Sequence, residues 1–144
     1  MYYLKALGWD LSKVQQTGSN FGPTLTHESP FLNSVGRGTM VSDGLNMMNA
    51  DYTSTSFRLS RVRIAGRNFL GNNMTFPIGA QVGENCLLAT KVMIPIDGPV
   101  RRDVGLLGSP AFEIPRTVQR DAQFDELKIA EAMNRLLPAK NRYN

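Results

Sequence analysis

The sequence predicts a mainly β fold in which short strands, joined by tight corners, wind into a single-stranded parallel β-helix. Large apolar residues recur at every sixth position from residue 64 onward, a period that fits neither a helix nor an ordinary strand. A second column of mostly small or apolar residues stands four positions after each of them, on the same strand face as the next large residue. Such faces are buried only when successive turns stack on one another. The first column is Ile64, Leu70, Phe76, Val82, Leu88, Ile94, Val100 and Leu106; the second is Asn68, Met74, Ala80, Cys86, Val92, Gly98 and Val104.

Six of the eight positions that follow the large residues hold Gly, Ala or Pro, which suits corners between strands. Together the columns resemble those of hexapeptide-repeat proteins, in which a large aliphatic residue is followed by small residues at the next and fourth positions. The resemblance implies that three hexads form one triangular coil and that the coils wind left-handed. The left-handed winding comes from the resemblance alone.

A looser hexad precedes this region, in another register. It places Val35, Val41, Met47, Thr53 and Leu59 inward, together with Thr39, Leu45, Asp51 and Phe57 four residues after the first four of these. Only five residues separate Leu59 from Ile64, so one position is lost between the two registers. Because a one-residue shift turns a strand over, we expect a loop or bulge near this point.

The chain of 144 residues is expected to form one domain in three parts. Residues 1–33 form an irregular lead-in or N-terminal cap, residues 34–108 form the coils, and residues 109–144 form an exit segment and a C-terminal helix. Between Asp121 and Leu137, apolar residues recur every three or four positions, as they do in an amphipathic helix. Asp121 is its expected cap and Pro138 its stop, and its apolar stripe is expected to pack on the coils.

Composition excludes several classes of function. The net charge of +4 comes from basic residues spread along the chain, without zinc-ligand spacing or an aromatic platform, so we expect no nucleic-acid partner. One cysteine and one histidine exclude a disulfide framework and a Cys/His metal site, and no metal is predicted. Cys86 falls in the inward column and is interpreted as a small buried hydrophobe rather than a nucleophile. No apolar run is long enough to span a membrane, and the N-terminus lacks the features of a signal peptide.

Several longer segments of the sequence resemble those of a more specific family. They are VGRGTMVSDGL, STSFRLSRVRI, LGNNMTFP, LLATKVMIPIDGPVR and GLLGSPAFEIPR. Over residues 24–142 the chain is similar to the C-terminal region of nonribosomal peptide synthetases that make homopolymers of basic amino acids, such as poly-ε-lysine. Part of the last segment also resembles the exit segment of hexapeptide acyltransferases, namely Gly108-Ser109-Pro110-Ala111 followed by Ile114.

The synthetase resemblance implies that the chain is one module of a longer membrane protein and forms amide bonds by aminoacyl transfer. Its partners would be the other domains of that synthetase, and it would reach the cytoplasmic face of the cell membrane through flanking segments. The fragment would hold no cofactor of its own, and the growing chain would arrive on the pantetheine arm of a carrier domain.

Two other functions stay open. One is a hexapeptide acyltransferase that uses coenzyme A and forms a homo-oligomer, a trimer as in its hexapeptide relatives. The other is a non-catalytic β-helical scaffold or dimerisation module, because about four coils with raw ends need to be capped by another element or chain.

Amide formation from an activated acyl group needs a base and donors that hold the tetrahedral oxyanion. His27, the only histidine, is the candidate base, since hexapeptide acyltransferases commonly use one histidine in this way. It lies in the segment THESPFLN beside Glu28 and before the first predicted coil. The alternative is an ordinary histidine of a surface loop.

A polar band in VSDGLNMMNADYTSTSF is the candidate substrate site. Asp43 is the second candidate catalytic residue, and carboxylates in this band would suit a cationic amino acid. Alternatively, these residues satisfy backbone groups at the corners. Asp51 falls at an inward position, so it is either buried and paired or a sign that the register is wrong. The substrate-binding candidates are Ser42, Asn46, Asn49, Asp51 and Ser54.

Three basic residues are alternative sites for the phosphate of coenzyme A or a pantetheine arm. They are Lys91, Arg101 and Arg102. Outward, solvated charges explain them more simply.

Overall fold

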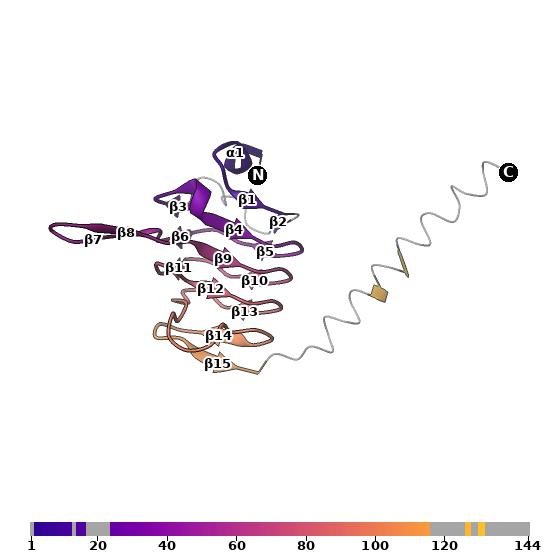
Figure 1. The fold of residues 1–144 in the computed structure, drawn as a ribbon. Coiled ribbons are helices and arrows are strands. Elements are labelled where there is room, and N and C mark those ends of the chain that lie inside the picture. The colour runs from indigo at the N-terminus through magenta and orange to yellow at the C-terminus, as the bar shows by residue number, and fades with distance from the viewer. Residues whose placement is uncertain (1, 13, 17–23, 116–125, 128–129, 132–144) are drawn as a thin grey trace.

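The computed structural model describes residues 2–12, 14–16, 24–115, 126–127 and 130–131. In them, short parallel strands stack into a three-sided prism, and one hairpin projects sideways from the stack (Figure 1). The prediction of a mainly β fold built from parallel strands is therefore confirmed, whereas the left-handed winding stays a prediction.

Three sheets form the sides of the prism. The first sheet contains β1 (Asp10–Leu11), β4 (Asn33–Val35), β9 (Val62–Ile64) and β12 (Gln81–Val82). The second contains β2 (Gln15–Gln16), β5 (Met40–Val41), β10 (Phe69–Leu70), β13 (Leu87–Leu88), β14 (Gly105–Leu107) and the antiparallel β15 (Phe112–Ile114). The third contains β3 (Thr26–His27), β6 (Leu45–Met47) and β11 (Met74–Phe76).

The chain visits the three sheets in turn, which defines five coils. Coil 1 runs through β1, β2 and β3, coil 2 through β4, β5 and β6, and coil 3 through β9, β10 and β11. Coil 4 runs through β12, β13 and a single bridge at Met93, and coil 5 through a single bridge at Arg101 and β14. Ile64 pairs with Val82 and Leu70 with Leu88, eighteen positions later in each case, so three hexads make one coil.

The predicted columns form the core. Of the large residues, seven are buried, with exposed fractions of 4% or less, and among the small ones Met74, Ala80, Cys86 and Val92 are buried as well. Each coil thus contributes side chains to one continuous apolar interior. This burial supplies most of the favourable free energy of a fold with strands of two or three residues.

Val100 departs from this pattern, and its predicted inward position is wrong. The side chain is 43% exposed, and Arg101 rather than Val100 bridges to Val82 in the first sheet. The segment from Pro95 to Pro99 takes one residue more than the other corners and displaces the strand position by one. Leu106 is buried again, paired with Leu88, because the following corner is one residue shorter.

A hairpin replaces part of the first predicted hexad. Val35, Val41 and Met47 are buried as predicted, but Thr53 and Leu59 are exposed, and so are Asp51 and Phe57 of the companion column. Here β7 (Ala50–Tyr52) and β8 (Phe57–Leu59) pair with each other in antiparallel fashion instead of joining the stack. Val35 pairs with Ile64, 29 positions on, so this coil carries eleven extra residues. They account for the register change near residue 60.

The first 33 residues are more regular than expected. After α1 (Tyr2–Ala6), strands β1, β2 and β3 pair in parallel with β4, β5 and β6, so the winding begins before residue 34. A short 3₁₀ helix, Pro30–Leu32, leads from coil 1 into coil 2. The sequence pattern missed coil 1 because its spacings are not hexads. Buried apolar residues nevertheless fill it: Leu4, Trp9 and Leu11.

Most of the helix predicted between Asp121 and Leu137 lies outside the described residues, and so does its packing on the coils. The division of the chain at residues 33 and 108 stays a prediction. Within the part of the chain that the structure describes, no helix has the length and apolarity to cross a bilayer.

Candidate functional site

His27 lies at the end of β3, half-buried beside the N-terminal segment. The indole Nε1–H of Trp9 donates a hydrogen bond to its Nδ1 over 2.8 Å, and the two ring centroids are 5.5 Å apart. Because an indole nitrogen can only donate, Nδ1 must be unprotonated, and the neutral ring carries its proton on Nε2. Burial lowers the pKa of His27 from 6.5, and the Glu28 carboxylate partly offsets this effect. The geometry therefore favours a neutral imidazole whose only unprotonated nitrogen is already occupied.

Glu28 anchors the base of the hairpin. Its Oε2 accepts hydrogen bonds from the backbone N–H groups of Asn49 and Ala50, the latter over 3.0 Å. The Asn49 side chain is fully buried, donates to Asn33 Oδ1 over 2.9 Å and accepts from Asn33 Nδ2 and the Ser29 N–H. A buried asparagine with these partners has no surface open to a substrate. The structure gives Asn49 a place in the framework of the third sheet.

The other residues of the predicted polar band do not converge on one site. Ser42 and Asp43 lie at the corner before β6, where Ser42 is buried and the Asp43 N–H donates to Asn72. Asn46 points outward from β6 and accepts a hydrogen bond from Thr26. Asp51 and Ser54 lie on the hairpin, exposed, with Asp51 in an ion pair with Arg58.

Asp43 and His27, the two candidate catalytic residues, are also apart. His27 pairs with Met47 at the end of β6, whereas Asp43 precedes the start of that strand. Four residues of extended chain span about 13 Å, too far for a direct contact between the two side chains. Their catalytic roles stay predictions that contacts within the described residues do not support.

A different cluster gathers at the corner between the first and second sheets, which we call the first corner. At the same point of successive coils, Arg67, Asn85 and Asp103 adopt left-handed backbone conformations with φ near 57°. Inside the corner, the buried Asn68 side chain donates to the carbonyls of Ala65 and Gly83 and accepts from the Cys86 N–H. Asn68 thus ties two neighbouring coils together and fixes the shape of the corner.

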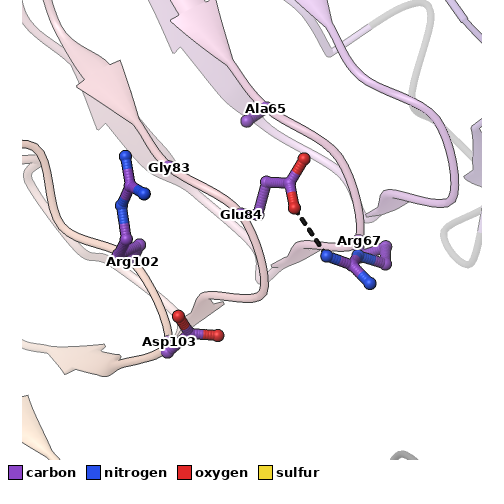
Figure 2. Close-up of a pocket in the computed structure, with 6 residues that line it drawn as sticks. All are labelled: Ala65, Arg67, Gly83, Glu84, Arg102 and Asp103. Atoms are coloured by element: carbon purple, nitrogen blue, oxygen red, sulfur yellow. Dashed lines mark hydrogen bonds and ion pairs between the residues drawn. The ribbon is translucent and has the colours of Figure 1, made fainter.

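A cleft of about 400 Å³ opens on the outer side of this corner, over coils 3 to 5. Figure 2 shows the Arg67–Glu84 ion pair, with nitrogen and oxygen 2.5 Å apart. Asp103 accepts a hydrogen bond from Asn85, while Arg102 has no ion-pair partner among the described residues. The lining residues are Ala65, Arg67, Gly83, Glu84, Arg102 and Asp103.

Gly83 sets how closely the coils approach in this cleft. A Cβ there would lie 2.6 Å from the Arg101 carbonyl oxygen and 2.8 Å from Arg102 Cβ. A larger residue would push the next coil away and move the Arg102 side chain. The position of the Arg102 guanidinium therefore depends on a glycine at residue 83 of the neighbouring coil.

The structure separates the three basic candidates for a phosphate. Arg101 already donates to the carbonyls of Asp97 and Pro99 and lies 3.8 Å from a Glu113 oxygen. Lys91 is an exposed residue at the next corner, away from the cleft. Arg102 alone of the three lines the cleft.

Sequence reasoning missed both Trp9 and the Arg67–Glu84 pair. Trp9 lies in a segment interpreted as irregular, although a tryptophan ring is usually well buried and its N–H then finds a hydrogen-bond acceptor. Arg67 and Glu84 are 17 positions apart, close to the length of one coil, so their stacking follows from the hexad count.

The fold is similar to that of a solved acetyltransferase. A maltose O-acetyltransferase from Clostridium difficile 630 superimposes with a TM-score of 0.59 over 78% of this chain and 72% of the enzyme, at 13% sequence identity. AntD, an N-acyltransferase from Bacillus cereus solved with dTDP and 3-hydroxybutyryl-CoA, gives a TM-score of 0.48 over 92% of this chain and 96% of that chain, also at 13% identity. No protein-family model and no curated protein matches the sequence.

At these identities the comparison establishes a shared fold and no more. The chain has an acyltransferase-like β-helix, which agrees with the hexapeptide resemblance in the sequence. The comparisons contain no support for the peptide-synthetase resemblance or for a membrane-bound parent protein.

Proposed function

We propose that the chain transfers an acyl group from a pantetheine thioester to an amine or hydroxyl acceptor. The observation that carries the proposal is the superposition on a maltose O-acetyltransferase across most of both chains. The donor we propose is coenzyme A, as in the acyltransferase alternative drawn from the sequence, because the fold is similar to that of an acetyltransferase. A role in a peptide synthetase, with a carrier-bound donor, is the narrower version of the same chemistry.

In this reaction the acceptor attacks the thioester carbonyl, the carbon–sulfur bond breaks, and the thiol leaves with the proton that the acceptor gives up. Holding donor and acceptor together supplies much of the rate in such transfers. Arg102 would bind a phosphate of the donor at the first corner, since a guanidinium forms paired hydrogen bonds with phosphate oxygens.

His27 has a limited role under this proposal. It lies in coil 1, whereas Arg102 lies in coil 5, about 19 Å along the stack at one strand spacing per coil. With Nδ1 bonded to Trp9, the imidazole is also poorly placed to take a proton. We therefore assign His27 to the packing of coil 1 and treat its predicted action as a base as the alternative.

Release of free thiol from acetyl-CoA tests the proposal, with a panel of amine and hydroxyl acceptors that includes lysine and maltose. We expect acceptor-dependent thiol release that falls about tenfold or more in Arg102→Gln and is unchanged in Lys91→Gln. His27→Gln is expected to retain most of the activity. Total loss in His27→Gln with an intact fold would restore His27 as the base.

The second candidate is a non-catalytic assembly module. Two observations favour an assembly module. The predicted site residues are dispersed, and His27 is hydrogen-bonded to Trp9, so the candidate residues have structural roles. Thiol release that is no faster with the protein than without it, for every acceptor, would favour this reading over acyl transfer.

A further inference from the structure

The three corners of the prism differ sharply in polarity. The first corner and the corner between the second and third sheets carry charged and amide side chains. The third corner, between the third and first sheets, comprises residues 28–32, 48–61, 77–80 and 95–100. Among the described residues it is the corner that carries exposed large apolar side chains, alongside several charged ones. Its exposed apolar residues include Phe31, Ile96 and Val100, and Ile78 is half-buried between them.

The hairpin that leaves this corner has one apolar face. In the antiparallel register Tyr52 lies opposite Phe57, and Ala50 opposite Leu59, so these four side chains share a face. Tyr52, Phe57 and Leu59 are 70%, 66% and 53% exposed. The opposite face carries the Asp51–Arg58 ion pair.

A hairpin with an exposed apolar face is stabilised when another surface covers that face. An isolated two-stranded hairpin is at best marginally stable in water, and this one projects away from the stack (Figure 1). Ile96 and Val100 are also uncovered, at 56% and 43% exposure, so the hairpin does not lie over them in its own chain. Phe31 is 75% exposed as well, although one side of its ring lies close to Gly8.

We propose that two copies of the chain dock third corner to third corner, in opposite directions, so that the hairpin of each covers Ile96 and Val100 of the other. The hairpin leaves between coils 2 and 3, and the Ile96–Val100 segment lies between coils 4 and 5. A two-fold axis midway between these levels passes beside Ile78 and brings each surface onto the other. The levels are about 10 Å apart, two strand spacings along the stack.

Charge supports the opposed arrangement. Arg61 follows the hairpin and Asp97 follows Ile96, and neither side chain has an ion-pair partner among the described residues. The two-fold axis brings Arg61 of one copy to the level of Asp97 of the other, twice per dimer. A parallel arrangement would instead place Arg61 beside Arg61. The described part of the chain itself therefore supplies a matching apolar surface and a matching charge, which favours a second copy as the occupant.

Sedimentation equilibrium of the full chain tests the dimer, which does not depend on the proposed acyl transfer. We expect a monomer–dimer equilibrium that weakens about tenfold or more in Tyr52→Ser, as for a central aromatic contact. Tyr3→Ser is the matched control, since Tyr3 is also 70% exposed but lies in α1. A protein that stays monomeric at about 100 μM, or forms trimers insensitive to Tyr52→Ser, would overturn the proposal.

Charge reversal tests the direction of docking. Arg61→Asp and Asp97→Arg are each expected to weaken the dimer, and the double variant to restore it, because the opposite charges meet again with their signs exchanged. Circular dichroism of each variant checks that the fold is retained. A double variant as weak as the sum of the single changes would rule out the opposed arrangement.

Discussion

At the scale of single residues, the Trp9–His27 hydrogen bond has the clearest chemical consequence. It joins the N-terminal segment to β3 and requires an unprotonated Nδ1. A proton on Nδ1 would turn this acceptor into a donor and break the bond. The same contact that stabilises coil 1 therefore makes stability depend on the charge of His27.

Acidification is expected to weaken the fold through His27. Burial lowers its pKa in the folded chain below 6.5, so between these two pKa values the unfolded chain binds more protons. The contribution of neutral His27 to the free energy of unfolding is complete above pH 6.5. It is lost as the pH falls through the lower pKa of His27 in the folded chain. Urea unfolding at pH 7.5 and 5.5 measures this loss, which is expected to be smaller in His27→Gln. An equal loss in both proteins would contradict the assignment.

Truncation of core and corner residues should give very different effects on stability. Leu88→Ala removes a fully buried side chain from the second sheet and is expected to cost about 2–5 kcal/mol. Val100→Ala removes an exposed one and is expected to cost less than about 0.5 kcal/mol in the monomer. Denaturant unfolding at low protein concentration measures both. Similar losses would mean that Val100 points inward after all.

The hexad count predicted the core from Ile64 to Ile94 because burial repeats with the coil. The count was wrong at Val100 and Asp51, because extra residues in the corner before Val100 and in the hairpin at Asp51 displace the strand positions from the six-residue spacing. The candidate site was less predictable. Asn49 is predicted in a substrate site by its residue type, but it forms hydrogen bonds with Glu28, Ser29 and Asn33, in a segment whose spacing is not a hexad and which the pattern left irregular.

At the scale of elements, the hairpin β7–β8 is the main interruption of the repeat. It is held at its base by Glu28, which accepts from two backbone N–H groups, and at its tip by hydrogen bonds between Thr53 and Ser56. Between these ends its strands contact each other rather than the stack. In the single chain, the position of the hairpin therefore depends mainly on the Glu28 hydrogen bonds at its base.

Removal of the Glu28 carboxylate should loosen this element selectively. Glu28→Ala leaves two N–H groups without their acceptor, a cost of about 1–3 kcal/mol. We expect faster amide hydrogen exchange in residues 50–59, while β10 and β13 are unaffected. Glu84→Ala, which breaks the exposed pair with Arg67, is the control and should leave the hairpin unchanged. Uniformly faster exchange across all coils would show that Glu28 supports the whole stack.

At the scale of the whole molecule, the three corners divide the surface by chemistry. The first corner presents a cleft with charged walls, and the third presents an apolar edge with a hairpin. A donor of acyl groups and a second copy of the chain would therefore meet different sides of the prism. The fold is shared with an acetyltransferase, and the cleft at the first corner is lined by Arg102, which has no ion-pair partner among the described residues.

Calorimetric titration of coenzyme A into the full chain tests the central claim most directly. The account predicts saturable binding that weakens about tenfold or more in Arg102→Gln and remains unchanged in Lys91→Gln. Coenzyme A that does not bind, or that binds wild type and Arg102→Gln equally well, would contradict it.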